Sequence, residues 1–275
     1  MFKNIFLASY PKSGNTWLRS IIGNFYKFGK DFSLNDLKSI PLLSIKKHFD
    51  EFENKIYIEN NELHFDWISQ NIIQCQNLLN TKSNHLNIFK THSVRHKKFT
   101  NETVNAGFIY IVRDPRDIVV SFKNFTGKDF DEIINELLFE KKLMIGSNGI
   151  QELLSTWELN VQSWLNYNSV PRLIIKYEDL KMNPKEIILN IKEFLNKIHR
   201  LNVNLRDQDI DKIIDNTNFN NLQKLENKNG FDEATKHSKF FRSGTSNQWK
   251  DVLTNTQIML IEKNLKSLMM YFNYI

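Results

Sequence analysis

The sequence predicts an α/β fold with three layers, in which a central parallel sheet is flanked by helices. Apolar runs of strand length alternate with helical patterns along most of the 275 residues, and this alternation is typical of parallel sheets covered on both faces. The clearest run, residues 108–112, is almost wholly apolar, as a central strand buried on both faces requires. No Pro/Gly/Ser-rich linker divides the chain, so we expect a single domain over residues 1–275.

Composition and charge narrow the class of protein. Hydrophobic residues make up 41% and aromatic residues 12%, which favours a globular chain over a disordered one. The net charge of +6 is compatible with an anionic ligand, but no basic run with interleaved aromatic residues predicts a nucleic-acid partner. The single cysteine, Cys75, excludes an intramolecular disulfide and a cysteine-based metal site, and it fits a reducing compartment.

The first apolar run, residues 5–8, begins too early to leave room for a signal peptide. Apolar runs elsewhere fall short of the roughly 20 residues that a membrane-spanning helix needs. We therefore expect a cytoplasmic protein with no membrane partner.

The loop after the first strand has the features of an anion site. A helix is predicted over residues 16–26, so unpaired backbone N–H groups and the positive end of the helix dipole meet at its start. Lys12 adds a charge, and Ser13, Gly14 and Thr16 are small enough for the backbone to close around an anion. The loop is of the P-loop type, although Lys12 precedes Gly14 and the glycine spacing of nucleotide kinases is absent. The alternative is a plain strand-to-helix turn with a surface lysine.

A second strand over residues 86–89 runs into Lys90-Thr91-His92 and follows a helix predicted over residues 67–79. Between the first helix and residue 63 the pattern is irregular, and we expect a cover over a site, with Phe32, Phe49 and Phe52 exposed. A plain surface segment is the alternative to a cover.

The strand over residues 108–112 ends in Arg113-Asp114-Pro115-Arg116-Asp117, where Pro115 suits the first turn of the next helix. Helices are predicted over residues 131–144 and 152–164. A third apolar strand, residues 173–177, precedes a helix that Asn183-Pro184 opens. The last third is helical and polar, with a loop over residues 240–249 and a terminal helix over residues 256–272.

Five of these segments together resemble the sulfotransferases that use 3′-phosphoadenosine 5′-phosphosulfate (PAPS). Their order and spacing agree with the family over nearly the whole chain. The resemblance matches Tyr10 to Trp17 with the 5′-phosphosulfate loop, Lys90-Thr91-His92 with the catalytic-histidine segment, Arg113 to Asp117 and on to Ser121 with the 3′-phosphate loop, and Tyr177-Glu178-Asp179-Leu180 and Thr217-Asn218-Phe219 with segments near the adenine.

The sequence also departs from the family pattern. Asn15 stands where many members have threonine, and Ser243 replaces the lysine of the usual Arg-Lys-Gly. Arg242 and Gly244 are kept, and Asn247-Gln248-Trp249 stands in place of Gly-Asp-Trp. The compact start is most similar to that of bacterial members that modify specialised metabolites.

The resemblance implies sulfuryl transfer from PAPS to a hydroxyl or amine of a small-molecule acceptor, with PAP (3′,5′-bisphosphoadenosine) as product and no metal. It implies that Lys12 stabilises the leaving bisphosphate, that His92 is the general base, and that Ser121 holds the 3′-phosphate and restrains Lys12. A monomer or a homodimer is expected. The implied cofactor-binding residues are Lys12, Ser13, Gly14, Asn15, Thr16, Trp17, Arg113, Ser121, Tyr177, Thr217, Phe219, Arg242, Ser243 and Gly244.

Other interpretations stay open at this point. A P-loop kinase of a small metabolite would use ATP and Mg²⁺, and a catalytically idle relative would only bind a nucleotide. A histidine after a strand is often structural, and His96 is the second candidate base. The Arg113 segment could instead be a salt-bridged helix cap, and Trp17 and Phe219 could be plain core. Lys90 has two interpretations, an assisting charge near the sulfate and a surface charge.

Overall fold

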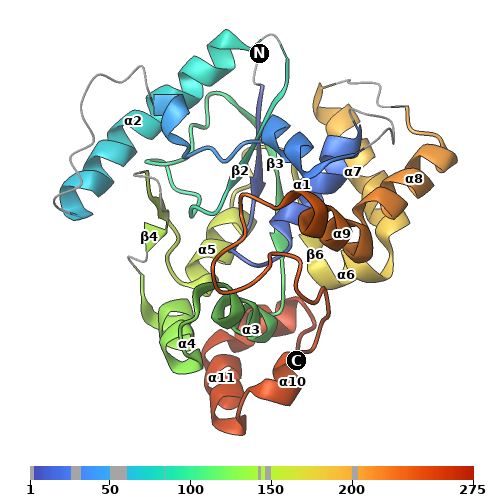
Figure 1. Ribbon diagram of the computed structural model, residues 1–275. Coiled ribbons are helices and arrows are strands. Elements are labelled where there is room, and N and C mark those ends of the chain that lie inside the picture. The colour runs from blue at the N-terminus through green and yellow to red at the C-terminus, as the bar shows by residue number, and fades with distance from the viewer. Residues whose placement is uncertain are drawn as a thin grey trace.

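The computed structural model confirms the α/β fold with a central parallel sheet (Figure 1). It describes residues 3–25, 32–49, 61–83, 85–141, 144–145, 150–199 and 204–275. Strands β1 (Asn4–Ala8), β2 (Asn87–Thr91), β3 (Asn105–Val112) and β6 (Arg172–Lys176) lie in the order β2-β1-β3-β6, and all neighbours are parallel. A separate antiparallel pair joins β4 (Met144–Ile145) to β5 (Glu152–Leu153).

Helices surround this sheet and fill the connections between its strands. Two short 3₁₀ helices, η1 (Leu34–Ser39) and η2 (Lys46–Phe49), lie between the first two α-helices. The α-helices are α1 (Asn15–Phe25), α2 (Asn61–Lys82), α3 (Pro115–Thr126), α4 (Phe130–Phe139), α5 (Trp157–Leu165), α6 (Tyr177–Met182), α7 (Pro184–His199), α8 (Asp207–Thr217), α9 (Phe219–Asn229), α10 (Trp249–Val252) and α11 (Asn255–Tyr271).

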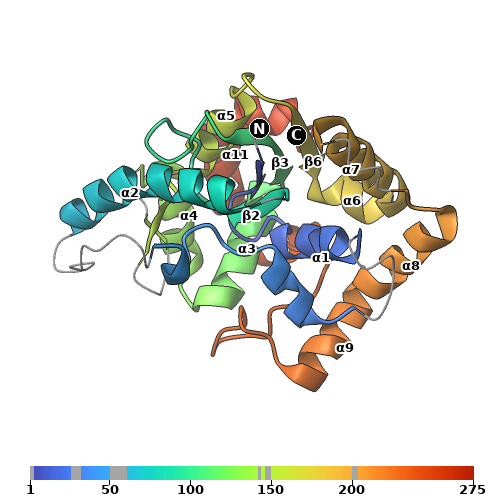
Figure 2. The same cartoon turned by 90° about the horizontal axis from the view of Figure 1, so that it is seen from above.

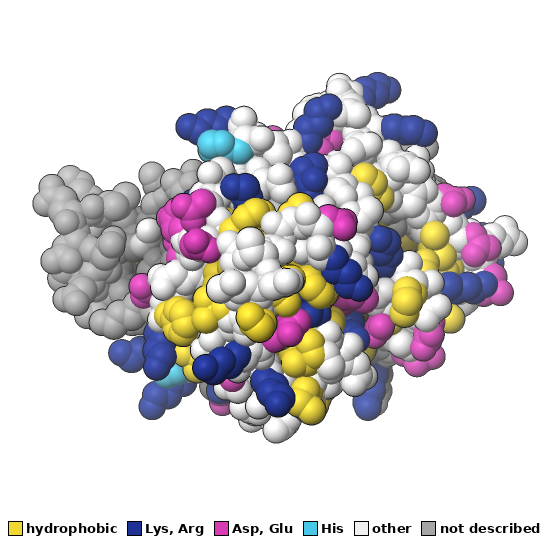
Figure 3. Space-filling model, turned by 90° about the horizontal axis from the view of Figure 1, so that it is seen from below, with side chains coloured by type: hydrophobic (Ala, Val, Ile, Leu, Met, Phe, Trp, Pro, Cys, Tyr) yellow, Lys and Arg dark blue, Asp and Glu magenta, His cyan; other side chains and the backbone are white. Residues whose placement is uncertain are grey.

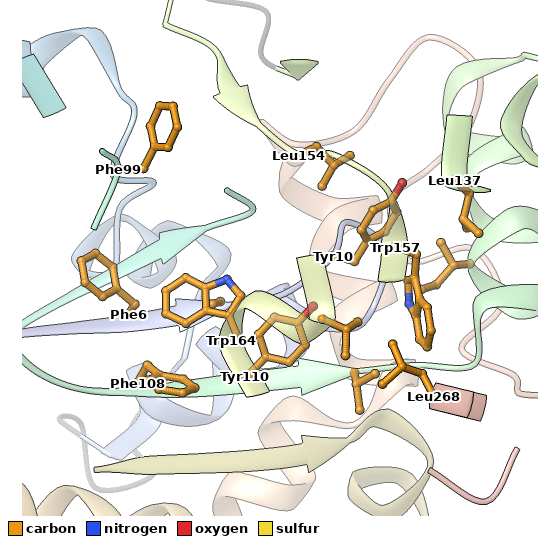
Figure 4. Packing of buried hydrophobic residues seen from close by; sticks show 14 of the residues in the cluster. Phe6, Tyr10, Phe99, Phe108, Tyr110, Leu137, Leu154, Trp157, Trp164 and Leu268 are labelled. Atoms are coloured by element: carbon orange, nitrogen blue, oxygen red, sulfur yellow. The ribbon is translucent and has the colours of Figure 1, made fainter. Parts of the chain in front are cut away.

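Alternation along the strands builds one core on each face of the sheet. Ile5 and Leu7 pack with side chains of α1, α7 and α8, whereas Phe6 and Tyr110 pack with α2, α3, α4, α5 and α11. Figure 2 shows these two sets of helices on opposite sides of the strands. In the second core the rings of Phe108 and Trp164 lie 5.0 Å apart (Figure 4). Successive strand residues therefore serve different layers, as the continuous apolar runs predict.

Amide side chains close the amino-terminal end of the sheet. Asn4 at the start of β1 donates to the carbonyl of Gln76 in α2 at 3.0 Å and accepts from Asn87 of β2 at 3.0 Å. Gln76 in turn donates to the carbonyl of Phe99 and accepts from the backbone N–H of Asn101. Asn4 and Gln76 are fully buried, so their polar groups are matched inside the protein.

Two predicted helices are shorter than the sequence pattern indicates. The helix predicted over residues 152–164 begins only at Trp157, because Thr156 caps it and its hydroxyl accepts from the N–H of Leu159. Residues 152–153 form β5 instead, and Ser155, with φ 62°, turns the chain between the two elements. The helix predicted over residues 131–144 ends at Phe139, and 144–145 form β4.

The prediction that Phe32 and Phe49 are exposed is wrong. Phe32 is 8% and Phe49 3% exposed, and Phe32 belongs to a third, smaller core with Leu37, Leu222 and Phe241. The irregular segment is also shorter than predicted, because α2 begins at residue 61. Phe52 and much of the expected cover, residues 26–31 and 50–60, lie outside the described residues.

The terminal helix α11 lies at the lower end of the molecule in Figure 1. Ile261, Leu265 and Met269 anchor this helix in the core, while Met259 and Tyr271 are 62% and 66% exposed. Figure 3 shows apolar side chains at this end mixed with lysine and arginine. Across the described ranges, we find no helix with the length and apolar character to span a membrane.

Candidate active site

The loop between β1 and α1 is shaped by two residues with positive φ. Lys12 has φ 67° and Gly14 has φ 100°, and these angles turn the backbone from the strand into the helix. A Cβ on Gly14 would lie 2.6 Å from Cδ2 of Tyr177, so the close approach of α6 also requires glycine. Asn15 fixes the loop because its amide donates to the carbonyl of Leu7 at 3.0 Å and to Oγ of Ser9 at 3.2 Å.

Ser13 supplies an unmatched polar group in this loop. Its side chain is fully buried, and its Oγ has no hydrogen-bond partner among the described residues. A buried hydroxyl without a partner suits a loop in which an oxygen of a ligand accepts its hydrogen bond. Ser13 and the start of α1 are therefore suited to oxygen atoms of an anion.

The Lys12 ammonium lies between two aromatic rings. Its Nζ is 4.0 Å from the ring centre of Phe125 and 4.4 Å from that of Phe240, a cation–π arrangement. Burial, together with the positive charges of Lys90 and Arg113, lowers the pKa of Lys12 to about 7. Lys12 makes no ion pair with any residue in the described part of the chain. Its charge is thus available to an anion.

His92 follows β2 and faces the same loop. Its Nδ1 lies 2.8 Å from the carbonyl oxygen of Ser9, and since a carbonyl only accepts, Nδ1 carries the proton. Nε2 is then the unprotonated nitrogen. Burial, and next the charge of Lys90, lower the pKa of His92 to about 3, so the imidazole is neutral at pH 7.

Two residues that the sequence did not single out hold the backbone of His92. Oε1 of Glu152 accepts from the backbone N–H of His92 at 3.2 Å and from the hydroxyl of Thr91 at 2.5 Å. The amide of Asn160 donates to the carbonyl of His92 at 2.9 Å and itself accepts from Tyr110. The second candidate base, His96, is exposed.

Arg113 connects the anion loop to the loop over residues 240–249. Its guanidinium donates to the carbonyl of Lys12 at 3.2 Å and to that of Thr245 at 3.0 Å, and it lies 4.3 Å from the ring centre of Tyr177. Its Nε is buried without a partner in the described residues, which fits an anionic oxygen. Ser121 lies half-buried on α3, two turns beyond Arg113.

The rest of the predicted nucleotide site divides into two groups. Trp17 meets Tyr177 edge to face with ring centres 5.7 Å apart, and Gly244, with φ 62°, leaves no room for a Cβ beside the ring of Phe219. Arg242 is exposed and donates to Gln248 at 2.6 Å, and the hydroxyl of Ser243 pairs with that of Thr245.

The hydroxyl of Thr217 bonds within its own helix and does not link this residue to the rings of Trp17, Tyr177 and Phe219. It is 1% exposed at the end of α8, and the hydroxyl donates to the carbonyl of Ile213 at 2.7 Å inside the same helix. Its position next to Asn218 and Phe219 places it near the base site only through the backbone.

Lys90 is not a surface charge. Its side chain is 12% exposed, and its Nζ lies 3.0 Å from the carboxylate of Glu233, which Arg19 also contacts. Glu233 accepts from Thr16 as well, at 3.1 Å. Sequence patterns gave no signal for Glu233, because it is one acid among many in a polar stretch and lies 143 residues from Lys90.

A cavity of about 360 Å³ lies outside this cluster. Asp114, Lys176, Glu178 and Tyr274 are among the residues that line it, whereas Lys12 and His92 do not. The convergence of an anion loop, two cationic side chains and a neutral histidine, and not this cavity, marks the candidate active site.

Comparison with known proteins gives the family. The family model of the sulfotransferase domain matches residues 2–272. The chain is 28% identical to flavonol 3-sulfotransferase of Flaveria bidentis over 272 residues, which cover 94% of this chain and 80% of that protein. It is 29% identical to cytosolic sulfotransferase 5 of Arabidopsis thaliana, with 96% of this chain and 80% of that protein covered.

Solved structures share the fold. A retinol dehydratase, determined with androsterone and the inactive cofactor PAP, superposes with a TM-score of 0.65 and 18% identity, covering 97% of this chain and 80% of that one. Mouse sulfotransferase SULT7A1, determined with PAP, gives a TM-score of 0.62 and 19% identity, covering 98% of this chain and 85% of that one.

Proposed function

Since this chain belongs to the family of PAPS-dependent sulfotransferases, we propose that it transfers a sulfuryl group from PAPS to a hydroxyl or amine of a small-molecule acceptor. The observation that carries the proposal is the approach of two groups to one loop. Lys12 lies within the loop, and His92 is hydrogen-bonded to the carbonyl of Ser9 at its start.

The residues present fit the donor nucleotide. The unmatched Oγ of Ser13 and the start of α1 are suited to the 5′-phosphosulfate, with Asn15 holding the loop in shape. The unmatched Nε of Arg113 supports a role in holding the 3′-phosphate, together with Ser121, Arg242 and Ser243. Trp17, Tyr177 and Phe219 supply ring faces and edges for the adenine, with Thr217 beside them. Gly14 and Gly244 have no Cβ and so let the rings of Tyr177 and Phe219 approach the backbone.

PAPS, when bound, supplies a sulfuryl group whose departure leaves negative charge on the oxygen that bridged it to the 5′-phosphate. Lys12 meets that charge as a fixed cation and thereby stabilises the transition state. Ser121 restrains Lys12 until the acceptor binds, a role proposed by analogy with the family. His92 takes the proton of the acceptor at Nε2, because Nδ1 is held by Ser9.

The low pKa of His92 and its role as a base are compatible. In the free protein, burial and the nearby Lys90 disfavour the imidazolium. The negative charge of a bound donor acts in the opposite direction, because it favours the protonated ring and screens Lys90. Basicity at Nε2 therefore rises when the donor site is filled.

The names of the relatives support a class of acceptor and a cellular location for this protein. Flavonol 3-sulfotransferase is named for a plant flavonol, and solved neighbours were determined with androsterone or retinol. A small organic acceptor is therefore proposed for this chain, along with a cytoplasmic location that the names of cytosolic relatives support. We also propose that residues 1–275 act as one domain, as a monomer or homodimer.

Isothermal titration with PAP, with and without Mg²⁺, tests the proposal on the wild-type protein and on Arg113→Ala. We expect binding that does not depend on Mg²⁺ and that Arg113→Ala weakens by about 100-fold, since a charged hydrogen-bond donor to a phosphate is lost. Arg206→Ala is the matched control, because Arg206 is an exposed arginine whose only ion-pair partner among the described residues is Asp209.

Binding of ATP with Mg²⁺ in place of PAP would overturn the proposal in favour of a small-metabolite kinase. If PAP binds, transfer from labelled PAPS to a panel of phenols, alcohols and amines then identifies the acceptor. Loss of transfer in His92→Ala with PAP affinity retained is the result expected of a general base.

A further inference from the structure

We propose that Glu233 is an internal anion that occupies part of the phosphosulfate subsite, and that a bound nucleotide must take Lys90, Arg19 and Thr16 from it. The inference rests on the proposed function, because the subsite is the one assigned above to the 5′ end of PAPS. It adds a competitor, contributed by the chain itself, to that site.

The contacts of Glu233 are those of a bound anion. Oε2 accepts from the hydroxyl of Thr16 at 3.1 Å and from Nζ of Lys90 at 3.0 Å, and Oε1 accepts from the guanidinium of Arg19. Two of these donors belong to α1, directly after the anion loop, and Lys90 precedes His92 by two residues. One carboxylate thus joins the anion loop unit to the strand end that carries the proposed base.

The charge of Glu233 is fully developed. Burial opposes ionisation, but the charges of Lys90 and Arg19 outweigh it and lower the pKa of Glu233 to about 2. The negative charge of Glu233 also reaches Lys12 and His92, where it partly offsets the lowering of the pKa of each group by burial and by neighbouring cations. A full negative charge therefore lies among the cations that the proposed function assigns to the donor.

The segment that carries Glu233 also contacts Lys12. Seven residues further on, the ring of Phe240 covers Nζ of Lys12 at 4.4 Å. The segment is held at both ends, because Thr235 donates to the carbonyl of Phe125 at 2.9 Å and Phe240 packs on Phe231. The segment over residues 231–240 is therefore held in place by several contacts while it touches both Lys90 and Lys12.

Competition follows from the sign of the charges. A phosphosulfate or 5′-phosphate that reaches the hydroxyl of Thr16 and the ammonium of Lys90 brings negative oxygens to the place of a carboxylate. Like charges at hydrogen-bond distance from one ammonium repel strongly in a partly buried site. The nucleotide and Glu233 therefore cannot hold these donors at the same time, and part of the nucleotide's binding free energy is used to displace the carboxylate.

The test compares two ligands on four proteins by isothermal titration. PAP carries a 5′-phosphate, whereas adenosine 3′-monophosphate lacks it and leaves the subsite of Glu233 alone. We expect Glu233→Gln to bind PAP about tenfold more tightly than wild type, equal to about 1.4 kcal/mol. Its affinity for adenosine 3′-monophosphate is expected to stay within about twofold of wild type.

Asp232→Asn is the matched control. It removes one negative charge from the neighbouring residue, whose carboxylate is 84% exposed and pairs with Lys38 at 3.5 Å on the surface. The control is expected to bind both ligands as wild type does. A second variant, Glu233→Met, removes the charge with an apolar side chain of similar length and must show the same gain for PAP.

Every other outcome would overturn the inference, and one of them would overturn the proposed function as well. Unchanged or weaker PAP binding in both Glu233 variants, with near-ultraviolet circular dichroism like that of wild type, shows that the carboxylate supports the site and does not compete for it. An equal gain for both ligands, or a gain in Asp232→Asn, reduces the effect to net charge and also overturns the inference. Failure of all proteins to bind PAP overturns the proposed function and, with it, the inference.

Discussion

The carboxylate of Asp117 accepts a hydrogen bond from the backbone N–H of Asn247 at 2.8 Å, across 130 residues of sequence. It also accepts from the N–H of Trp249 at 3.4 Å and lies 3.7 Å from the guanidinium of Arg113. The helix after the central strand therefore holds the loop that contains Arg242, Ser243 and Gly244. One buried side chain fixes the two segments proposed to share the 3′-phosphate.

Asp117→Ala should weaken PAP binding by about tenfold or more, because the backbone N–H groups of Asn247 and Trp249 lose their acceptor and the loop over residues 240–249 loses its anchor. Titration with PAP measures the change. Asp211→Ala, at an exposed position on α8, is the control and should bind normally. Wild-type affinity in Asp117→Ala would show that the loop is held by its other contacts.

PAP affinity should fall as pH rises from 7 to 9. The pKa of Lys12 is lowered to about 7 in the free protein, so the free amine becomes neutral above that pH. A bound anion favours the charged form, and binding therefore takes up a proton at alkaline pH. Titration in buffers of different ionisation enthalpy measures this proton. Lys12→Arg stays charged, so its affinity should be flat over the same range; a proton uptake equal to wild type in that variant assigns the titration to another group.

Glu152→Ala should lower kcat by about tenfold to 100-fold with little change in the KM for PAPS, since Oε1 of Glu152 holds the N–H of His92 and the hydroxyl of Thr91. Glu152→Gln keeps an acceptor oxygen at that position and should recover most of the rate. Steady-state kinetics measure both variants, and near-ultraviolet circular dichroism like that of wild type excludes a general loss of folding. A rate for Glu152→Gln as low as that of Glu152→Ala would show that the acceptor oxygen does not position His92.

Ser243→Lys should tighten PAP binding several-fold, by about 1 kcal/mol, because it returns a cation beside Arg242 at the proposed 3′-phosphate subsite. The gain should shrink as salt is added. Ser39→Lys adds the same charge at an exposed position on η1, outside that loop, and serves as control. Equal affinities for the two variants would mean that the loop binds no phosphate at residue 243.

Much of the site could be predicted because its parts are local in sequence. Gly14 follows from the turn into α1, and Pro115 and Asp114 mark the start of α3, where Asp114 caps the helix. The parallel sheet then brings the ends of β1, β2 and β3 to one edge, so Lys12, His92 and Arg113 meet without further information.

Contacts between distant segments could not be predicted from one sequence. Glu152 fitted the start of a helical pattern, yet residues 152–153 pair with β4, and the carboxylate turns to Thr91 and His92. Glu233 has no periodic neighbour that sets it apart. Phe32 and Phe49 looked exposed because a polar segment surrounds them, but each is covered by side chains from elsewhere in the chain.

The hydrogen bonds at the amino-terminal end of the sheet are made by uncharged amide side chains, whereas the groups that titrate lie at the opposite end. Asn4, Gln76 and Asn87 carry no proton that comes or goes between pH 4 and pH 9, whereas the opposite end of the same strands holds lysine, histidine and glutamate. Between these pH values Lys12, with its pKa of about 7, changes charge at one end of the strands, while the amide hydrogen bonds at the other end stay unchanged. Substitution of a charged side chain after the carboxyl ends of β1 and β2 therefore leaves in place the amide hydrogen bonds that align these strands at their amino-terminal ends.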